Sequence, residues 1–172
     1  MPCCHAWQIL IRGFATALVY LESVRDYRGF DDREGWRHGV AHGSDLLMQL
    51  VLNEALDKPQ LDRMLKAVTT QVAPPGEHFY VYGEPERLAR PIIFASMRGL
   101  HSVEEWSAWF ARIAAPAPLA SWDEAFASNA GLARRHNTRA FLLGVYAGIR
   151  DSKDPSVLRM LPAVDAALAS VP

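Results

Sequence analysis

Apolar side chains recur every three or four residues along most of the chain, which is the spacing of one face of an α-helix. The first such stretch predicts a helix from Trp7 to about Tyr27. Its expected core contacts are Ile9, Leu10, Phe14, Leu18, Leu21 and Val24. Gly29 follows shortly afterwards, and glycine is the residue that most often ends a helix. We therefore expect this helix to break at residues 28–32.

The same spacing predicts six further helical segments, several of which carry signals for a helix end. Asp57 is a candidate N-cap before Pro59, and Ser102 with Glu105 resembles a capping box. The expected segments are 36–53, 57–72, 85–98, 102–114, 121–149 (which the Asn-Ala-Gly sequence at 129–131 can interrupt) and 154–169. Residues 78–83 are rich in β-forming side chains, and we interpret them as an ordered loop.

Helices of roughly 12–20 residues joined by short connections are typical of antiparallel helix pairs. The sequence therefore predicts an all-α fold in which such pairs stack as a HEAT-like or α/α superhelical bundle. At 172 residues the chain suits one α-helical domain over 1–172. The sequence contains no repeat of fixed period, so it predicts no regular repeat array.

Composition narrows the class of protein without naming a reaction. The formal net charge is −1, so no basic surplus points to nucleic acid as a partner. No stretch is apolar and long enough to predict a membrane span, and Arg12 interrupts the nearest candidate. Cys3 and Cys4 are adjacent, which favours neither a disulfide framework nor a thiolate zinc site. The cytoplasm is therefore the expected location.

The densest group of chemically versatile residues is GWRHGVAHGSD at residues 35–45. On a helix, His38, His42 and Asp45 are spaced i, i+4 and i+7, so they would share an arc of roughly 60°. Glycine repeats every fourth residue along one flank, at Gly35, Gly39 and Gly43. Because each glycine weakens a helix by about 1 kcal/mol relative to alanine, we expect a compensating close approach by another helix or a ligand.

This stripe has three functional interpretations and one structural alternative. His38, His42 and Asp45 could ligate a divalent metal, although the glutamate of the zincin motif is missing. His42 could act as a general base polarised by Asp45, or by Glu22 from the preceding helix. The stripe could also line a polar pocket for a small molecule without any metal or cofactor. The alternative is that these residues form the solvated face of an ordinary amphipathic helix.

Other polar residues are candidates for the same site. Arg28 could reach the histidine stripe or cap a helix end. Glu84 and Arg87 could face a central groove, although acidic residues in a first turn also favour the helix dipole. The tryptophans are interpreted mainly as core residues, and Trp36 is also retained as a ligand-binding candidate.

Three blocks of the sequence carry a resemblance to a known family. They are YLESVRDYRGF at 20–30, GWRHGVAHGSDLL at 35–47 and YGEPERLA at 82–89. Over about residues 14–150 the chain resembles the bacterial domain-of-unknown-function 2785 family, which it would join as a member shortened at the N-terminus. The resemblance implies an all-α fold of stacked helix pairs and no known activity. It also implies that one constellation contains Glu22, Asp26, Arg28, His38, His42, Asp45, Glu84 and Arg87.

The expected function is a binding or interaction module with a polar groove lined by the helix of His38, His42 and Asp45. Its ligand-binding candidates are Arg28, Trp36, His38, Glu84 and Arg87. The alternative is a hydrolase that uses His42 and Asp45, with or without a divalent metal. The expected partner is another protein or a second copy of the chain, because a shortened N-terminus would leave one face of residues 7–21 uncovered.

Overall fold

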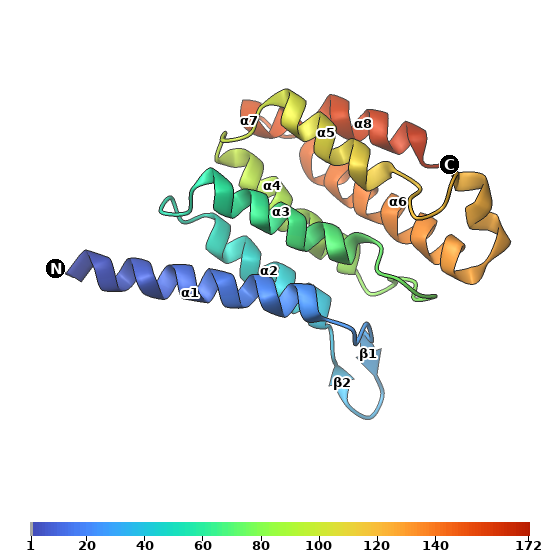
Figure 1. Ribbon diagram of the computed structural model, residues 1–172, viewed down its shortest axis with the longest axis horizontal. Helices are drawn as coiled ribbons and strands as arrows, with labels where there is room; N and C mark the ends of the chain where they lie inside the picture. Colours follow the sequence, from blue (N-terminus) through green and yellow to red (C-terminus); the bar gives the residue numbers. More distant parts are fainter. Residues whose placement is uncertain (1) are drawn as a thin grey trace.

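Helices make up most of the chain in the computed structural model, which describes residues 2–172 and the side chains from Trp7 onward (Figure 1). The side chains of Cys3 and Cys4 lie outside the described residues. In the described part of the chain the α-helices are α1 (Pro2–Ser23), α2 (Gly39–Val51), α3 (Lys58–Val72), α4 (Glu84–Met97), α5 (Val103–Ala114), α6 (Asn129–Ile149), α7 (Pro155–Leu158) and α8 (Leu161–Ser170). The prediction of an all-α fold is confirmed.

The remaining regular elements are short. A 3-10 helix, η1 (Trp122–Ala127), precedes α6, and β1 (Phe30–Asp31) pairs antiparallel with β2 (Gly35–Trp36). This hairpin was not expected from the sequence. It turns tightly because the Asp31 carboxylate accepts the N–H groups of Arg33 and Glu34, both at 2.9 Å. Gly35 completes the turn with a φ of 72°, a conformation that favours glycine.

Two helix starts follow the predicted capping chemistry. The Asp57 carboxylate accepts the Gln60 N–H at 3.0 Å, and the Gln60 side chain accepts the Asp57 N–H in return. Ser102 and Glu105 form the same reciprocal pair at the start of α5. These contacts satisfy backbone donors that the first turn of a helix leaves free.

Other boundaries differ from the expectation. The first helix ends at Ser23, and the second begins at Gly39 because residues 35 and 36 belong to β2. The predicted last helix is divided into α7 and α8. Pro162 lies in the first turn of α8, where its missing N–H has no helical partner to lose.

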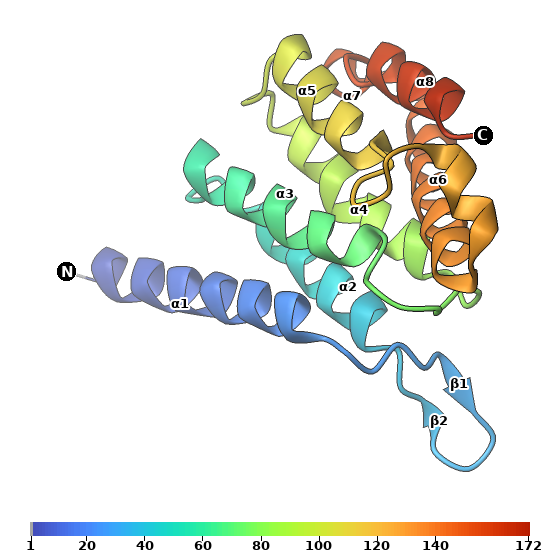
Figure 2. The same cartoon turned by 45° about the vertical axis from the view of Figure 1, so that its right-hand side comes forward.

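The helices form two layers of stacked pairs (Figures 1 and 2). α1 and α3 pack side by side in one layer, and α2, α4 and α6 follow one another in the second. α8 covers α5 and α6 at the C-terminal end. α1 can pack closely on α2 because α2 presents Gly43, where an added Cβ would lie 3.1 Å from Leu21. The expected close approach at Gly39 and Gly43 is therefore present, whereas Gly35 lies in the hairpin.

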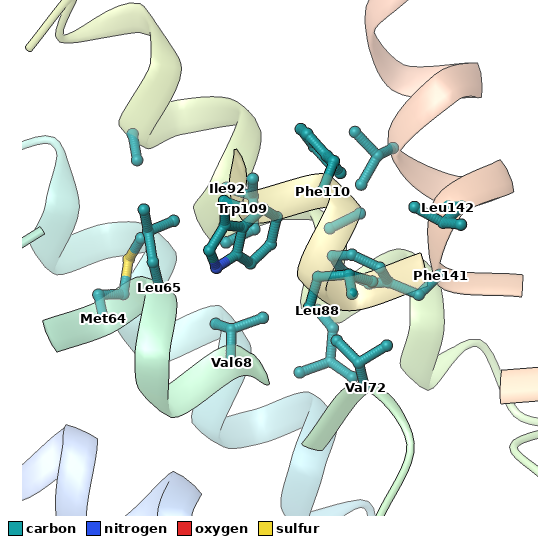
Figure 3. Close-up of a cluster of buried hydrophobic side chains, with 14 of the residues drawn as sticks. Met64, Leu65, Val68, Val72, Leu88, Ile92, Trp109, Phe110, Phe141 and Leu142 are labelled. Atoms are coloured by element: carbon teal, nitrogen blue, oxygen red, sulfur yellow. The ribbon is translucent and has the colours of Figure 1, made fainter. Parts of the chain in front are cut away.

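The core lies between the layers and is filled by the apolar stripes of α3, α4, α5 and α6 (Figure 3). The labelled core residues are Met64, Leu65, Val68, Val72, Leu88, Ile92, Trp109, Phe110, Phe141 and Leu142. Their spacing in each helix is the three-to-four-residue repeat that predicted the helices. Among the described residues, no helix is both long and apolar enough to cross a membrane.

Phe110→Ala should lower the free energy of unfolding by about 3–5 kcal/mol, because it leaves a cavity where a fully buried ring stood. The matched change Phe126→Ala, at a ring that is 57% exposed, should lower it by less than about 1 kcal/mol. Urea denaturation followed by circular dichroism measures both. Equal losses for the two variants would contradict this account of the core.

Candidate functional site

α2 begins at Gly39, so His38 lies just before the helix that was predicted to carry it together with His42 and Asp45. His38 is the N-cap residue and has a left-handed backbone, with φ 39° and ψ 37°. Its ring is therefore not carried on the helix face that holds His42 and Asp45. The prediction of one stripe containing His38, His42 and Asp45 is wrong, because it required helical backbone from residue 36 onward.

His38 instead forms a buried pair with Glu84 of α4. His38 Nε2 lies 3.3 Å from Glu84 Oε1, and the two side chains are 10% and 2% exposed. Glu84 Oε2 also accepts the Tyr82 N–H at 2.9 Å. Glu84 is the first residue of α4, where the helix dipole favours a negative charge. The carboxylate is therefore held by a backbone N–H and a helix N-terminus. His38 Nε2 and Glu84 Oε1 lie close together, but neither has a hydrogen-bond partner in the described part of the chain.

Three aromatic rings cover this pair and form what we call the aromatic patch: Phe30, Trp36 and Tyr82. The Trp36 ring lies 4.6 Å from the His38 ring, measured between centroids. Tyr82 and Phe30 meet Trp36 edge to face at 5.8 and 5.3 Å. All three patch residues are solvent-exposed, and Trp36 is 57% exposed. The interpretation of Trp36 as a core residue is therefore wrong, whereas Trp106, Trp109 and Trp122 are buried as expected.

The hairpin and the loop of residues 78–83 meet at Gly29. The Tyr82 ring packs directly against this glycine, so that an added Cβ would overlap the ring. The Arg37 N–H donates to the Gly29 carbonyl at 2.8 Å, and the His38 N–H donates to the Arg28 carbonyl at 3.1 Å. The absence of a side chain at position 29 thus allows the hairpin base and the loop to touch.

A buried asparagine holds the same loop from the opposite side. Asn137 of α6 accepts the Tyr80 N–H at 2.9 Å and donates to the His78 carbonyl at 2.9 Å. His136 Nε2 lies 3.1 Å from the Tyr80 carbonyl oxygen, and the Tyr80 hydroxyl donates to the Gln71 carbonyl. The sequence pattern alone did not reveal this role of Asn137. Its position in a buried apolar stripe, four residues from Ala133 and Phe141, was the available signal.

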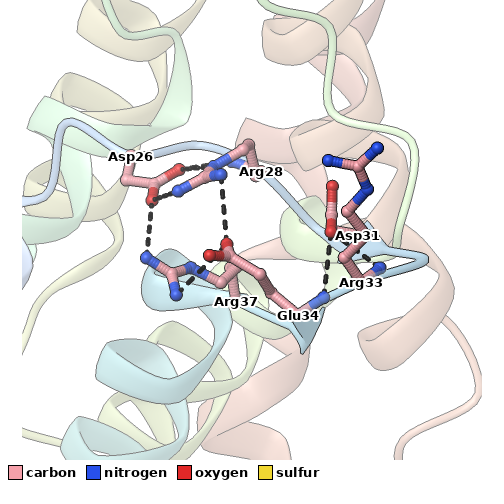
Figure 4. Close-up of polar contacts among 6 residues, drawn as sticks. All are labelled: Asp26, Arg28, Asp31, Arg33, Glu34 and Arg37. Carbon is pink, nitrogen blue, oxygen red and sulfur yellow. Dashed lines mark hydrogen bonds and ion pairs between the residues drawn. The ribbon is translucent and has the colours of Figure 1, made fainter.

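Arg28 does not reach the buried histidine. Its guanidinium binds Asp26 at 2.7 Å and Glu34 at 3.3 Å, and Arg37 lies across the same two carboxylates (Figure 4). The hydrogen bond from Arg28 holds the pKa of Asp26 well below its usual range. All four side chains are about half exposed, so the network orients the hairpin and adds little stability.

Of the remaining candidates, only His42 lies beside His38. The two imidazole rings meet edge to face with their centroids 6.1 Å apart, and His42 is exposed and also lines a groove between α1 and α2. The Asp45 carboxylate pairs with Arg87 and lies 3.5 Å from Arg90, which joins α2 to α4. Glu22 is half-buried near the end of α1, and in the part of the chain that the structure describes its carboxylate makes no hydrogen bond or ion pair.

The expected constellation is therefore divided. His38 lies beside Glu84, Trp36 and His42. Arg28 and the Asp45–Arg87 pair belong to separate ion pairs. Among the side chains that the structure describes, from Trp7 onward, no group of three or more His, Cys, Asp or Glu is placed to hold a metal ion. The predicted metal set of His38, His42 and Asp45 is thus not assembled.

His78 adds a half-buried imidazole beside the site. Its ring stacks on Tyr27 at 5.5 Å, and its Nε2 has no hydrogen-bond partner in the described part of the chain. Burial lowers the pKa of His78 below its ordinary value of 6.5, despite the opposing effect of Glu84.

Gly29→Ala should lower the free energy of unfolding by about 1–3 kcal/mol, because the new methyl group displaces the Tyr82 ring. In a Tyr82→Ala background the same change should have little effect, since the ring it meets is gone. A double-mutant cycle by urea denaturation measures this coupling. Equal effects in both backgrounds would show that the Tyr82 contact is not the cause.

Stability should fall as the pH is lowered below about 6.5, because unfolded His78 takes up a proton that the folded environment resists. The loss ends below the folded-state pKa, where both states are protonated. Urea denaturation between about pH 8 and pH 5 should therefore show a shallower decline for His78→Gln than for the wild type. Parallel curves would refute this role of His78.

Comparisons with known proteins identify a family but no activity. Residues 10–146 match the family described as "Protein of unknown function (DUF2785)". Neither a curated protein nor a solved structure matches the chain. The matched range includes the hairpin, the His38–Glu84 pair and the loop of residues 78–83. The family match covers most of the chain, so the chain belongs to the DUF2785 family.

Proposed function

We propose that this protein is a binding module and that the aromatic patch of Phe30, Trp36 and Tyr82 is its recognition surface. The observation that carries the proposal is a set of exposed aromatic rings seated on a buried His38–Glu84 pair. Exposed tryptophan and tyrosine are the residue types that contribute most to protein interfaces.

The patch is held in one arrangement before any partner binds. Trp36 packs against His38, whose imidazole lies against Glu84, and Tyr82 is fixed through its backbone N–H to the same carboxylate. The hairpin beneath is oriented by ion pairs of Arg28 and Arg37. A rigid surface loses little conformational entropy on binding, which favours affinity.

The chemistry of the rim indicates the kind of partner. Arg28 and Arg37 alternate with Asp26 and Glu34 beside the patch, so the rim has no net charge. This combination of an aromatic centre and a mixed-charge rim suits a protein segment with an apolar anchor and charges of both signs. The net charge of −1 gives no support to a nucleic acid partner. We also propose a cytoplasmic location and a HEAT-like use of the stacked helix pairs as a scaffold for this surface.

A hydrolase remains the alternative, with less support. An imidazole oriented by a buried carboxylate is the arrangement of a general base, and His38–Glu84 fits it better than His42 with Asp45. The nearby hydroxyl of Ser44 is buried and donates to the Val40 carbonyl at 2.8 Å, so it is engaged within α2. A binding role uses the same pair without requiring a nucleophile.

A random peptide library displayed on phage tests the proposal directly. Selection on the wild-type protein should yield a convergent set of sequences, and synthetic peptides of that set should bind in calorimetry. Trp36→Ala and Tyr82→Ala should each weaken binding at least about 10-fold, as expected for central aromatic contacts.

Phe126→Ala is the matched control, because Phe126 is as exposed as Trp36 but lies on η1. It should leave peptide affinity unchanged. The proposal fails if no convergent peptides are selected, or if the three variants bind the selected peptides equally.

A further inference from the structure

The outward face of α1 carries large apolar side chains and almost no charge. Between Trp7 and Leu21 the only charged residue is Arg12. Among the described side chains, Ile9, Val19 and Tyr20 are the large ones exposed on this face. Trp7 is exposed as well, but at about 100° per residue it lies on the side of the helix that carries the buried Phe14 and Leu18. A helix face that remains in water normally carries several charged residues, and apolar surface of this kind usually marks an interface.

An apolar groove lies beside this face. It has a volume of about 570 Å³ and runs between α1 and α2. Its lining consists of Gly13, Thr16, Ala17, Tyr20, His42, Leu46 and Leu50. An added Cβ at Gly13 would meet no other atom within 4 Å, so another helix can approach α1 closely there. None of the lining residues is acidic, lysine or arginine, so the groove suits an occupant without charge.

We propose that the occupant is α1 of a second copy of this chain, in a dimer with two-fold symmetry. The N-terminal part of α1 extends beyond α2 and α3, whereas its C-terminal half lines the groove (Figures 1 and 2). When two such helices cross antiparallel at Gly13, the extending part of each copy lies over the groove-lining half of the other. Ile9 of one copy is then level with Ala17 of its partner, which lines the groove. A two-fold interface of this kind uses the same surface twice, as most homodimers do.

Charge and area both suit this occupant. α1 offers the nearly uncharged helix that the groove requires, and the long side chain of Arg12 can remain in solvent at the rim. Three large side chains of the contact face, those of Ile9, Tyr20 and Leu46, are each about half exposed. Covering them together with the exposed Gly13, Thr16 and His42 in both copies removes on the order of 1,000 Å² from water, which is the size at which specific interfaces begin.

Analytical ultracentrifugation tests the dimer. The wild-type protein should sediment with twice the mass of 19.1 kDa at micromolar concentration. Leu46→Glu and Gly13→Glu should each raise the dissociation constant at least about 10-fold, because each places a carboxylate in the apolar contact. Gly13→Glu should not weaken α1 itself, since glutamate is a better helix former than glycine.

Leu143→Glu is the matched control. Leu143 on α6 is 46% exposed and Leu46 is 47% exposed, so both replacements put the same charge on a similarly exposed leucine. The control should leave the dimer intact, and Trp36→Ala should do the same. In a Cys3→Ser, Cys4→Ser background, oxidised Gly13→Cys should form a disulfide-linked dimer, and Leu143→Cys should not.

Two results would overturn the proposal. One is a wild-type protein that remains monomeric at about 100 µM, because its dissociation constant would then be higher than the proposed interface should give. The other is an oligomer that Leu46→Glu and Leu143→Glu affect equally, because the contact would then lie on a different surface.

Discussion

The buried contact between His38 and Glu84 constrains the whole candidate site. A carboxylate that is 2% exposed would destabilise the fold by several kcal/mol without polar partners. The Tyr82 N–H and the start of α4 supply these partners, and the imidazole of His38 lies against the same carboxylate without a hydrogen bond. Each partner belongs to a different segment, so satisfying one charge fixes the hairpin end, the loop and the helix relative to one another. The aromatic patch lies on the solvent side of this contact, because Trp36 packs on His38 and Tyr82 is bound to Glu84 through its backbone.

The helices contribute to the site mainly by holding irregular segments. Asn137 projects from α6 and binds the backbone of residues 78–80, which a loop could not order by itself. Gly29 lets the Tyr82 ring approach the base of the hairpin. The packed core between the helix layers provides rigidity, and the loop and the hairpin provide the exposed chemistry. Functional loops supported by a rigid core are common in proteins that bind other molecules.

The two proposed surfaces lie on different parts of the α1–α2 pair. The aromatic patch is built on the hairpin that connects these helices, whereas the apolar groove runs along their length. Both fall within residues 10–146, the range that matches the DUF2785 family. A dimer through α1 would leave the aromatic rings free, since Trp36 belongs to β2 and is not part of the groove lining.

Local sequence determined the helices and several of their ends. The three-to-four-residue apolar spacing, the capping boxes at Asp57 and Ser102 and the break after α1 each depend on residues a few positions apart, so they can be recognised without a tertiary structure. The site could not be deduced in this way. His38 has a left-handed backbone, and in this conformation its ring contacts Glu84, which lies 46 residues later in the chain. The burial of Asn137 likewise depends on which loop packs against α6. Only the packing of distant segments decides such contacts, because the free energy of burying a polar group depends on partners that local sequence does not specify.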